Sequence, residues 1–437
     1  MFFDSAAHGP LAKYSMLACE PRAALFRDAH GHLSARGREI VAGNFLDNLE
    51  AWFRAEATPA APASASASRS LPFVGGWFVY LGYEVAAEIE PRLRLPPADA
   101  PYSAFALRVD TFALHDLAED RVYVVSENST SGAHQRLIAD LSAAGDEQGV
   151  DTDAVVEVSL QEEEPAELFL ARVRAAQEHI AAGDLYQANL SRRWRLVLRN
   201  RAGAAKVYGA LRRANPAPFA ASVQLPGMAI FSSSPERLMR IEGREISTRP
   251  IAGTRARQGS AEQDRRDTAE LVAHPKERAE HVMLIDLERN DLGRVCEAGS
   301  VIVDEYMVTE SYAHVHHIVS NVRGRLRAEC SPVDALRALF PGGTITGCPK
   351  IRCMQIIAAL EGEGRGAYTG SLGWLGLDGD ADFNILIRTL TMRGDMIELR
   401  AGAGIVADSV PEKELEETRA KARGMLRAFS TVPGEGR

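Results

Sequence analysis

The chain has 437 residues, of which 46% are hydrophobic and 25% charged, and its formal net charge is −9. This length allows a large core or two domains, and the acidic balance argues against a dedicated nucleic-acid-binding protein. No apolar run reaches the length of a membrane span, the N-terminus lacks the pattern of a secretory signal, and the five scattered cysteines favour reduced thiols in the cytoplasm.

The first third of the chain has the pattern of a sheet. A short strand is expected at residues 14–21, and glycines between aromatic residues in 72–84 indicate a strand with a close backbone approach. Two strands joined by a hairpin are expected in residues 105–125. Residues 57–70 are rich in Ala, Ser and Pro, as is typical of an exposed loop.

An acidic stretch at residues 146–167 suggests a boundary inside the chain. It divides the sequence into an N-terminal region, residues 1–150, and a second region, residues 165–432. A solvated connector without any function explains the same composition.

The second region begins with a helix at residues 168–182, which ends at Gly183, a favourable residue just after a helix. Strands are expected next, separated by polar segments, at residues 184–191, 219–231 and 238–246. Residues 247–257 then combine three arginines with a proline and a Gly-Thr pair. Such a basic loop can hold an anion, or it can pair with nearby acidic side chains.

Two helices carry glutamates at the same spacing. Glu277 and Glu280 follow Pro275, and Glu414 and Glu417 lie near the C-terminus, so each pair shares one helix face. Four carboxylates from two helices are a candidate site for a hard cation. Mg²⁺ takes few protein oxygens, so two bound glutamates and two outer ones would suffice. Two unrelated surface helices would give the same pattern.

Three further segments lie between these helices. Residues 314–320 form a strand-like segment with three histidines, each of which is more often structural than catalytic. Residues 340–350 form a glycine- and threonine-rich loop before a helix, and they lack the Gly-Lys-Thr or Gly-Lys-Ser ending of a P-loop. Strands are expected at residues 368–374 and 383–389, and the second buries Arg388 among apolar residues. A buried arginine requires an anionic partner.

The C-terminal segment is predicted as a strand end, a glycine turn at residues 402–404 and a helix. Ser409 and Glu412 have the spacing of a capping box, and Lys421 lies on the face of the Glu414 and Glu417 pair. The N–H groups of the turn suit a carboxylate or a phosphate. A capped surface helix after a tight turn is the alternative.

These motifs, taken in order, resemble the chorismate-utilising enzymes, a family that includes anthranilate synthase, aminodeoxychorismate synthase, and the isochorismate and salicylate synthases. The resemblance is strong from residue 168 onward and weaker in the first third. It implies an α+β fold, a large sandwich of packed antiparallel sheets with outer helices. The motifs are Arg-Pro-Ile-Ala-Gly-Thr, Glu-x-x-Glu-His-x-Met-Leu-Ile-Asp-Leu-x-Arg-Asn-Asp-Leu-Gly, Gly-Gly-Thr-Ile-Thr-Gly-x-Pro-Lys, Ile-Arg-Thr and Gly-Ala-Gly-Ile-Val-Ala-Asp-Ser.

The resemblance also implies roles for individual residues. Glu280 and Glu417 match Mg²⁺ ligands, with Glu277 and Glu414 as their outer partners. His317 matches the histidine near the departing group of the substrate. The positions that match those around the ring and its leaving hydroxyl are Gly253, Thr254 and Thr344. The positions that match those holding the substrate carboxylates are Tyr368, Arg388, Gly402, Ala403, Gly404 and Lys421.

Within the family, four stretches look more like aminodeoxychorismate synthase than anthranilate synthase, at residues 184–190, 233–237, 316–320 and 340–347. One position departs from that pattern. Many aminodeoxychorismate synthases carry a nucleophilic lysine where this chain has Ala252, and alanine is the residue found in anthranilate synthases. An alanine cannot form a covalent intermediate, so the product is either aminodeoxychorismate by direct amination or anthranilate.

The chain lacks the cysteine context of a glutaminase. A class I glutamine amidotransferase needs a nucleophilic cysteine on a tight glycine-flanked turn with a histidine partner, whereas Cys348 is followed by Pro349. The resemblance therefore implies chorismate as the substrate and a separate glutamine amidotransferase subunit as the source of ammonia.

Overall fold

The computed structural model describes residues 1–7, 13–41, 43–58, 71–146, 155–200, 202–256, 263, 266, 269–270, 275–311 and 315–431. The side chains of residues 145–146, 252, 254–256, 275–276, 311 and 315–316 lie outside this description. No helix within the described ranges is both long and apolar enough to cross a membrane.

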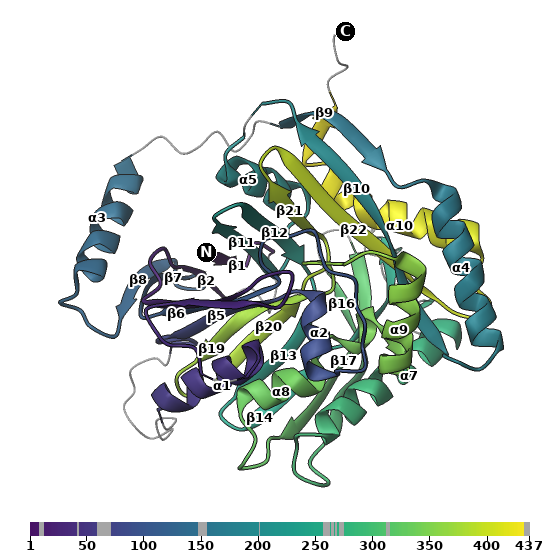
Figure 1. Cartoon of the computed structure of the whole chain (residues 1–437), viewed down its shortest axis with the longest axis horizontal. Coiled ribbons are helices and arrows are strands. Elements are labelled where there is room, and N and C mark those ends of the chain that lie inside the picture. The colour runs from purple at the N-terminus through teal and green to yellow at the C-terminus, as the bar shows by residue number, and fades with distance from the viewer. Residues whose placement is uncertain are drawn as a thin grey trace.

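Two large sheets form the centre of the described structure, and helices lie around them (Figure 1). All strand pairs described are antiparallel except the pair β9–β23, which is parallel. This arrangement confirms the predicted α+β class. The twelve-stranded sheet contains, in spatial order, β23 (Phe429–Thr431), β9 (Val156–Glu163), β10 (Gln187–Leu198), β22 (Met396–Ile405), β21 (Thr389–Arg393), β12 (Met228–Ser234), β11 (Phe219–Leu225), β1 (Phe2–Asp4), β2 (Tyr14–Leu17), β7 (Thr111–Asp116) and β8 (Arg121–Ser126), with β18 (Gly347–Cys348) beside β10.

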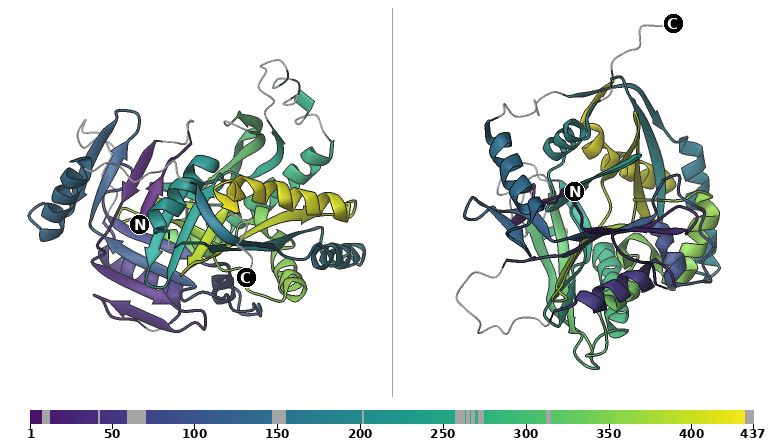
Figure 2. Two further views of the ribbon diagram at one scale, coloured as in Figure 1. Left: turned by 90° about the horizontal axis from the view of Figure 1, so that it is seen from above. Right: turned by 60° about the vertical axis from the view of Figure 1, so that its left-hand side comes forward.

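The second sheet has eleven strands among the described residues. Its spatial order is β15 (Ile251–Ala256), β17 (Val315–Arg325), β14 (Glu245–Thr248), β13 (Arg237–Glu242), β20 (Ala381–Ile385), β19 (Ser371–Gly376), β5 (Gly76–Leu81), β6 (Ala104–Val109), β3 (Ala23–Arg27) and β4 (Leu33–Arg36), with β16 (Ile302–Ser311) beside β17. Figures 1 and 2 show strands from the first third of the chain beside strands from later parts: β1 pairs with β11 of the middle third, and β5 pairs with β19 of the last third. The N-terminal strands therefore belong to both sheets.

A hydrophobic core fills the space between the two sheets. Phe78 and Phe105 of the eleven-stranded sheet pack in one cluster with Phe112 and Ile230 of the twelve-stranded sheet, and all four are fully buried. Burying such side chains stabilises the fold by about 1.5–3 kcal/mol each.

Further clusters join the sheets to helices on the outside of the molecule. The described helices are α1 (Phe45–Glu56), α2 (Ala86–Ile89), α3 (Gly132–Asp146), α4 (Ala166–Ala181), α5 (Ala204–Ala214), α7 (Pro275–Gly293), α8 (Pro332–Leu339), α9 (Lys350–Glu361) and α10 (Pro411–Leu426), with the short turns η1 (Tyr83–Val85) and η2 (Gly343–Ile345).

Several predicted elements have different boundaries in the structure. Residues 219–231 and 238–246 are each broken by a turn, at Gly227 and Gly243, which adopt positive φ angles, so each segment gives a hairpin rather than one strand. The polar residues 232–234, expected as a loop, are the end of β12. These turns were missed because a glycine inside an apolar run also fits a strand with a close backbone approach.

The acidic segment is more than a connector. Its residues 156–163 form β9, which lies between β10 and β23 at one end of the twelve-stranded sheet. Residues 147–154 of this segment lie outside the described ranges. The acidic side chains misled the prediction because strand β9 is exposed along most of its length.

The basic segment at residues 247–257 is also mainly strand. It contains the end of β14 and all of β15, and Arg249 forms ion pairs of 2.6 Å with Glu305 and Glu310 of β16. For Arg249, the alternative of pairing with nearby acids is therefore confirmed.

Candidate active site

Four segments meet around the carboxyl group of Glu236, which lies in the short connection between β12 and β13. The Oγ1 hydroxyl of Thr344, in η2, donates a hydrogen bond of 2.7 Å to Oε1 of Glu236. Arg388, between β20 and β21, and Lys421, on α10, act on this carboxyl through their positive charges. Two residues predicted to hold substrate carboxylates and one predicted to face the ring thus converge on a carboxyl group that sequence reasoning did not assign.

Glu236 is buried, and its environment favours the protonated form. Burial raises the pKa of its carboxyl to about 7, although the hydrogen bond from Thr344 and the charges of Lys421 and Arg388 lower it. A carboxyl with a pKa near neutrality can donate a proton and recover it at physiological pH. A sequence signal for it existed, a glutamate directly after a buried strand and a proline, but the same pattern is typical of an ordinary turn.

Arg388 has the properties of an anion-binding residue. It interrupts the strand expected at residues 383–389, and its φ angle of 50° is uncommon for a residue other than glycine. Burial lowers the pKa of its guanidinium, against the effect of Glu236. Among the described residues, none forms an ion pair with this guanidinium. The strained backbone and the unpaired charge are typical of a functional site.

The glycine segment at residues 402–404 is strand rather than turn, which corrects the prediction. Gly402, Ala403 and Gly404 continue β22 and pair in register with Ser191, Leu190 and Asn189 of β10. Strand β21 pairs with β22 only as far as Leu399, so β21 does not cover the opposite edge of residues 402–404. The binding role of residues 402–404 stays a prediction.

The two glycines make room for polar side chains. A Cβ atom on Gly402 would lie 2.5 Å from the hydroxyl of Tyr368 and 2.6 Å from Oδ1 of Asn189, and one on Gly404 would lie 2.5 Å from Nε2 of Gln187. Lys421 Nζ donates a hydrogen bond of 2.9 Å to the Gly402 carbonyl. Tyr368, Gly402 and Lys421 are therefore together as predicted, with Asn189 as a further member. We call Asn189, Tyr368, Gly402 and Lys421 the carboxylate site.

Replacing Gly402 by alanine should destabilise the protein by about 1–3 kcal/mol, because the new methyl group also comes within 2.7 Å of the Leu190 carbonyl, which the sheet holds in place. Urea unfolding measures the change. Gly293→Ala is the matched control, since nothing lies within 4 Å of its Cβ position. Equal stability of the two variants would contradict the close packing described here.

The two glutamate pairs lie on α7 and α10. Glu414 is buried, which argues against the alternative of a surface helix at this position, whereas Glu417 is exposed and pairs with Lys421 at 2.7 Å. The predicted capping box is absent at the start of α10: Val410 is the N-cap, and the Ser409 hydroxyl accepts from the N–H of Val406 instead. Pro411 occupies the first turn of α10, where its missing N–H costs no hydrogen bond.

A metal site is not preformed among the described residues, which contain no group of three or more His, Cys, Asp or Glu side chains placed to hold an ion. Mg²⁺ usually binds through one or two carboxylates, with waters and substrate oxygens completing the shell. Glu280 and Glu417 supply two carboxylates, which is the protein donor set that such a site requires. Magnesium binding by these residues stays a prediction.

The remaining predicted residues lie on β15 and β17. A bulge in β15 places Gly253 at a φ angle of 61°, which favours glycine, and Thr254 is paired in register with His317, which is buried. The side chains of Ala252 and Thr254 lie outside the description, as does His314.

His281, a residue that sequence reasoning passed over, is buried on α7 with its Nε2 2.7 Å from the Ser320 hydroxyl, and burial lowers its pKa to about 4.

A second buried carboxyl lies next to η2. Burial and the neighbouring Asp291 raise the pKa of Glu288 to about 8, although Lys350 lowers it. Lys350 itself forms an ion pair with Asp291. Glu288 Oε1 is close to Gly343, since a Cβ atom on that glycine would lie 3.3 Å away. Glu288 therefore holds a proton in the folded protein at neutral pH.

Glu288→Gln should stabilise the protein relative to the wild type as pH rises. Between the usual glutamate pKa and about 8, the folded wild type binds more protons than the unfolded chain, so its stability falls with increasing pH. Glutamine removes this loss, which amounts to roughly 2–4 kcal/mol by pH 9. Urea unfolding at pH 5.5, 7 and 9 measures it, with the exposed Asp286→Asn as control. A stability difference that does not change with pH would contradict the buried, protonated state.

Comparisons of the sequence and of the fold with known proteins find several similar chains. The sequence pattern of the chorismate-binding enzymes matches residues 14–427. The chain is 40% identical over 400 residues to aminodeoxychorismate synthase component 1 of Bacillus subtilis, covering 89% of this chain and 82% of that protein. It is 44% identical over 380 residues to anthranilate synthase component 1 of Streptomyces coelicolor, covering 82% and 73%. The crystal structure of anthranilate synthase component I from Streptococcus pneumoniae matches with a TM-score of 0.82 at 30% identity, over 96% of this chain and 93% of that one.

Proposed function

Because the chain belongs to the family of chorismate-binding enzymes, we propose that it is an aminodeoxychorismate synthase component I, which aminates chorismate to 4-amino-4-deoxychorismate, the precursor of 4-aminobenzoate in folate synthesis. One observation carries this choice within the family. Three of the stretches that resemble aminodeoxychorismate synthase contribute side chains around the site: Gln187 and Asn189, Glu236, and Thr344.

The site has the charges that chorismate requires. Chorismate carries two carboxylates, and the guanidinium of Arg388 and the ammonium of Lys421 lie near Glu236, with the uncovered edge of residues 402–404 beside Lys421. Charge-assisted hydrogen bonds from such groups are roughly twice as strong as neutral ones. Arg388 and Lys421 would hold the carboxylates and leave Glu236 facing the ring.

Glu236 is suited to protonate the leaving hydroxyl. As the bond between ammonia nitrogen and ring carbon forms, the bond between the ring and its hydroxyl oxygen breaks, and the proton of Glu236 converts that oxygen to water. The new ammonium group then loses one proton, which restores the carboxyl group. Thr344 orients Glu236 through its hydrogen bond, and His317 is predicted to lie near the departing oxygen. Mg²⁺, when bound by Glu280 and Glu417, would polarise the ring carboxylate and favour departure of the hydroxyl.

Ammonia is proposed to come from a separate glutamine amidotransferase subunit. A glutaminase nucleophile needs a thiol of lowered pKa. Burial instead raises the pKa of Cys296 to about 11 and that of Cys353 to about 12, and it also raises the pKa of Cys348. The two remaining cysteines, Cys19 and Cys330, have no glycine-flanked turn around them in the sequence.

The purified chain tests the proposal with two nitrogen sources. With chorismate and Mg²⁺, an ammonium salt should support consumption of chorismate, and glutamine alone should not. Turnover with glutamine alone would contradict a separate ammonia source. Failure with both nitrogen sources would contradict amination of chorismate by this chain.

Anthranilate synthase component I is the second candidate. Ala252 favours it, because alanine at this position is the anthranilate synthase residue and excludes covalent attack by a lysine. The two candidates differ in product, since anthranilate formation also eliminates pyruvate.

A further inference from the structure

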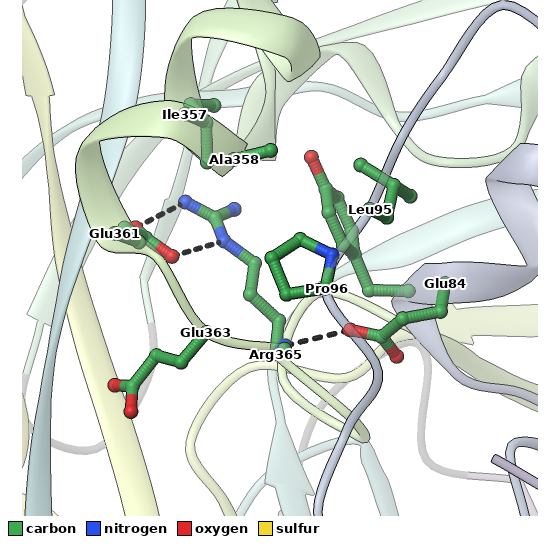
Figure 3. Close-up of a pocket in the computed structure, with 10 residues that line it drawn as sticks. Glu84, Leu95, Pro96, Ile357, Ala358, Glu361, Glu363 and Arg365 are labelled. Atoms are coloured by element: carbon green, nitrogen blue, oxygen red, sulfur yellow. Dashed lines mark hydrogen bonds and ion pairs between the residues drawn. The ribbon is translucent and has the colours of Figure 1, made fainter.

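A buried ion pair lies directly behind the carboxylate site. Glu361 is the last residue of α9, and Arg365 follows in the loop before Tyr368 (Figure 3). Their side chains are each about 1% exposed, and Arg365 donates to both carboxylate oxygens of Glu361, over 2.7 and 2.9 Å. Although burial opposes ionisation, Arg365 and Arg400 hold the pKa of Glu361 below its usual range. Both groups are therefore charged inside the protein.

We propose that Glu361 and Arg365 are positioning residues for the carboxylate site, and that Glu84 from the N-terminal region fixes them in place. This inference rests on the proposed function, because it assigns the pair a part in binding the substrate carboxylates. Neither residue needs to touch the substrate.

Glu361 fixes the strand that carries Asn189. Its Oε1 accepts hydrogen bonds from the N–H of Ser191 at 2.8 Å and from the Ser191 hydroxyl at 3.0 Å. Ser191 is the register partner of Gly402, and Asn189 is that of Gly404. The carboxylate of Glu361 therefore sets the position of β10 where β10 supports the glycines of β22.

Arg365 contacts two members of the carboxylate site, Asn189 and Tyr368. Its Nη2 donates a hydrogen bond of 2.6 Å to the Asn189 carbonyl, and its guanidinium stacks 5.5 Å from the ring centre of Tyr368. The Tyr368 hydroxyl lies 3.5 Å from Oδ1 of Asn189. One guanidinium thus sets both the backbone of Asn189 and the ring of Tyr368, the two groups that surround Gly402. A lysine has neither the planar fork nor the stacking face for this.

The N-terminal region completes the arrangement. Tyr83 and Glu84 both lie on η1. Oε1 of Glu84 accepts hydrogen bonds from the N–H of Arg365 at 2.7 Å and from that of Gly366 at 3.2 Å. The ring centre of Tyr83 lies 5.0 Å from the Arg365 guanidinium, which stacks on it. Figure 3 shows the Glu84 carboxyl bonded to the backbone N–H of Arg365, while the Arg365 guanidinium points toward Glu361. Leu95 and Pro96 line the same small cavity, which has a volume of about 10 Å³. Residues 281 positions apart in the sequence therefore hold one loop of the site.

The chain offers a matched control for a purely structural ion pair. Arg108 is also buried, forms ion pairs with Glu56 and Glu127, and stacks on Trp77 at 5.2 Å. It lies on β6, away from the carboxylate site. Arg108→Lys and Arg365→Lys remove the same kind of bidentate, stacked contact, so they should lower the melting temperature to a similar extent.

The test compares the two variants per folded molecule. Arg365→Lys should raise both KM and the calorimetric Kd for chorismate about tenfold or more, because a misplaced hydrogen bond to a charged group loses about that much affinity, while Arg108→Lys should change them less than threefold. Calorimetry without ammonia measures binding in the absence of turnover. Equal KM and Kd in the two variants would overturn the proposal.

Glu84 and Glu361 give variants that keep the test decisive if Arg365→Lys does not fold. Glu84→Gln retains the acceptor oxygen and should keep the wild-type KM, whereas Glu84→Ala and Glu361→Gln should raise KM at least tenfold. A wild-type KM in Glu84→Ala would overturn the role of Glu84. Hydrogen exchange at the amides of residues 189–191 separates this inference from the proposed function: it should quicken in Arg365→Lys and not in Arg108→Lys, even if the wild type does not bind chorismate.

Discussion

Replacing Glu236 by glutamine should lower kcat for chorismate amination by about 10²–10⁴-fold, the usual contribution of a positioned general acid. Glutamine has the same shape and still accepts the hydrogen bond that Thr344 donates, so the site should remain assembled and KM should change little. The amide has no proton of suitable acidity to give to the leaving hydroxyl. The loss should therefore fall on kcat rather than on binding.

The pH dependence of the same variant gives a second readout. Since Glu236 acts in its protonated form with a pKa of about 7, wild-type kcat should decline as pH rises through that value. The decline should be missing in Glu236→Gln. Glu242→Gln, at the exposed end of β13, is the control and should keep both the rate and the pH profile. A kcat for Glu236→Gln within threefold of the wild type would show that another group protonates the hydroxyl.

Glu417→Gln should remove Mg²⁺-dependent turnover, with a loss of about 10³-fold or more, because the metal's stabilisation of a departing group amounts to several kcal/mol. Glu417 and Glu280 are the two predicted direct ligands, and a neutral amide is a much weaker oxygen donor for Mg²⁺. Glu416→Gln is the matched control, because Glu416 is the adjacent residue on α10, is exposed, and pairs with Arg419.

Metal binding can be measured apart from turnover. Mn²⁺ in place of Mg²⁺ allows binding to be followed by magnetic resonance in the presence of chorismate, and affinity should fall in Glu417→Gln and not in Glu416→Gln. Unchanged Mn²⁺ affinity and unchanged turnover in Glu417→Gln would remove Glu417 from the metal site.

The sequence predicted the parts of the site whose residue types are unusual for their place. Arg388 was identified because an arginine in an apolar strand requires an anion. Gly402 was identified because a glycine turn offers N–H groups to an anion, although the structure has strand there. The structure shows which side chains approach Gly402, namely Tyr368 and Asn189. Such local signals can be read from a short segment.

Other features depend on contacts between distant segments, which no local pattern reveals. Glu236 looks like a turn residue until Thr344, Arg388 and Lys421 surround it. Strand β9 looks like an acidic linker until β10 and β23 pair with it. The ion pair of Glu361 and Arg365 has ordinary helix spacing, and its contact with Glu84 joins segments 281 positions apart in the sequence.

The most direct test of the account identifies the product. The purified chain is incubated with chorismate, Mg²⁺ and an ammonium salt, and an aminodeoxychorismate lyase is then added to half of the sample. The account predicts 4-aminobenzoate only in the half that contains the lyase, which means that amination at ring carbon four proceeds without a lysine at position 252. Anthranilate fluorescence in both halves would contradict it and would make the chain an anthranilate synthase.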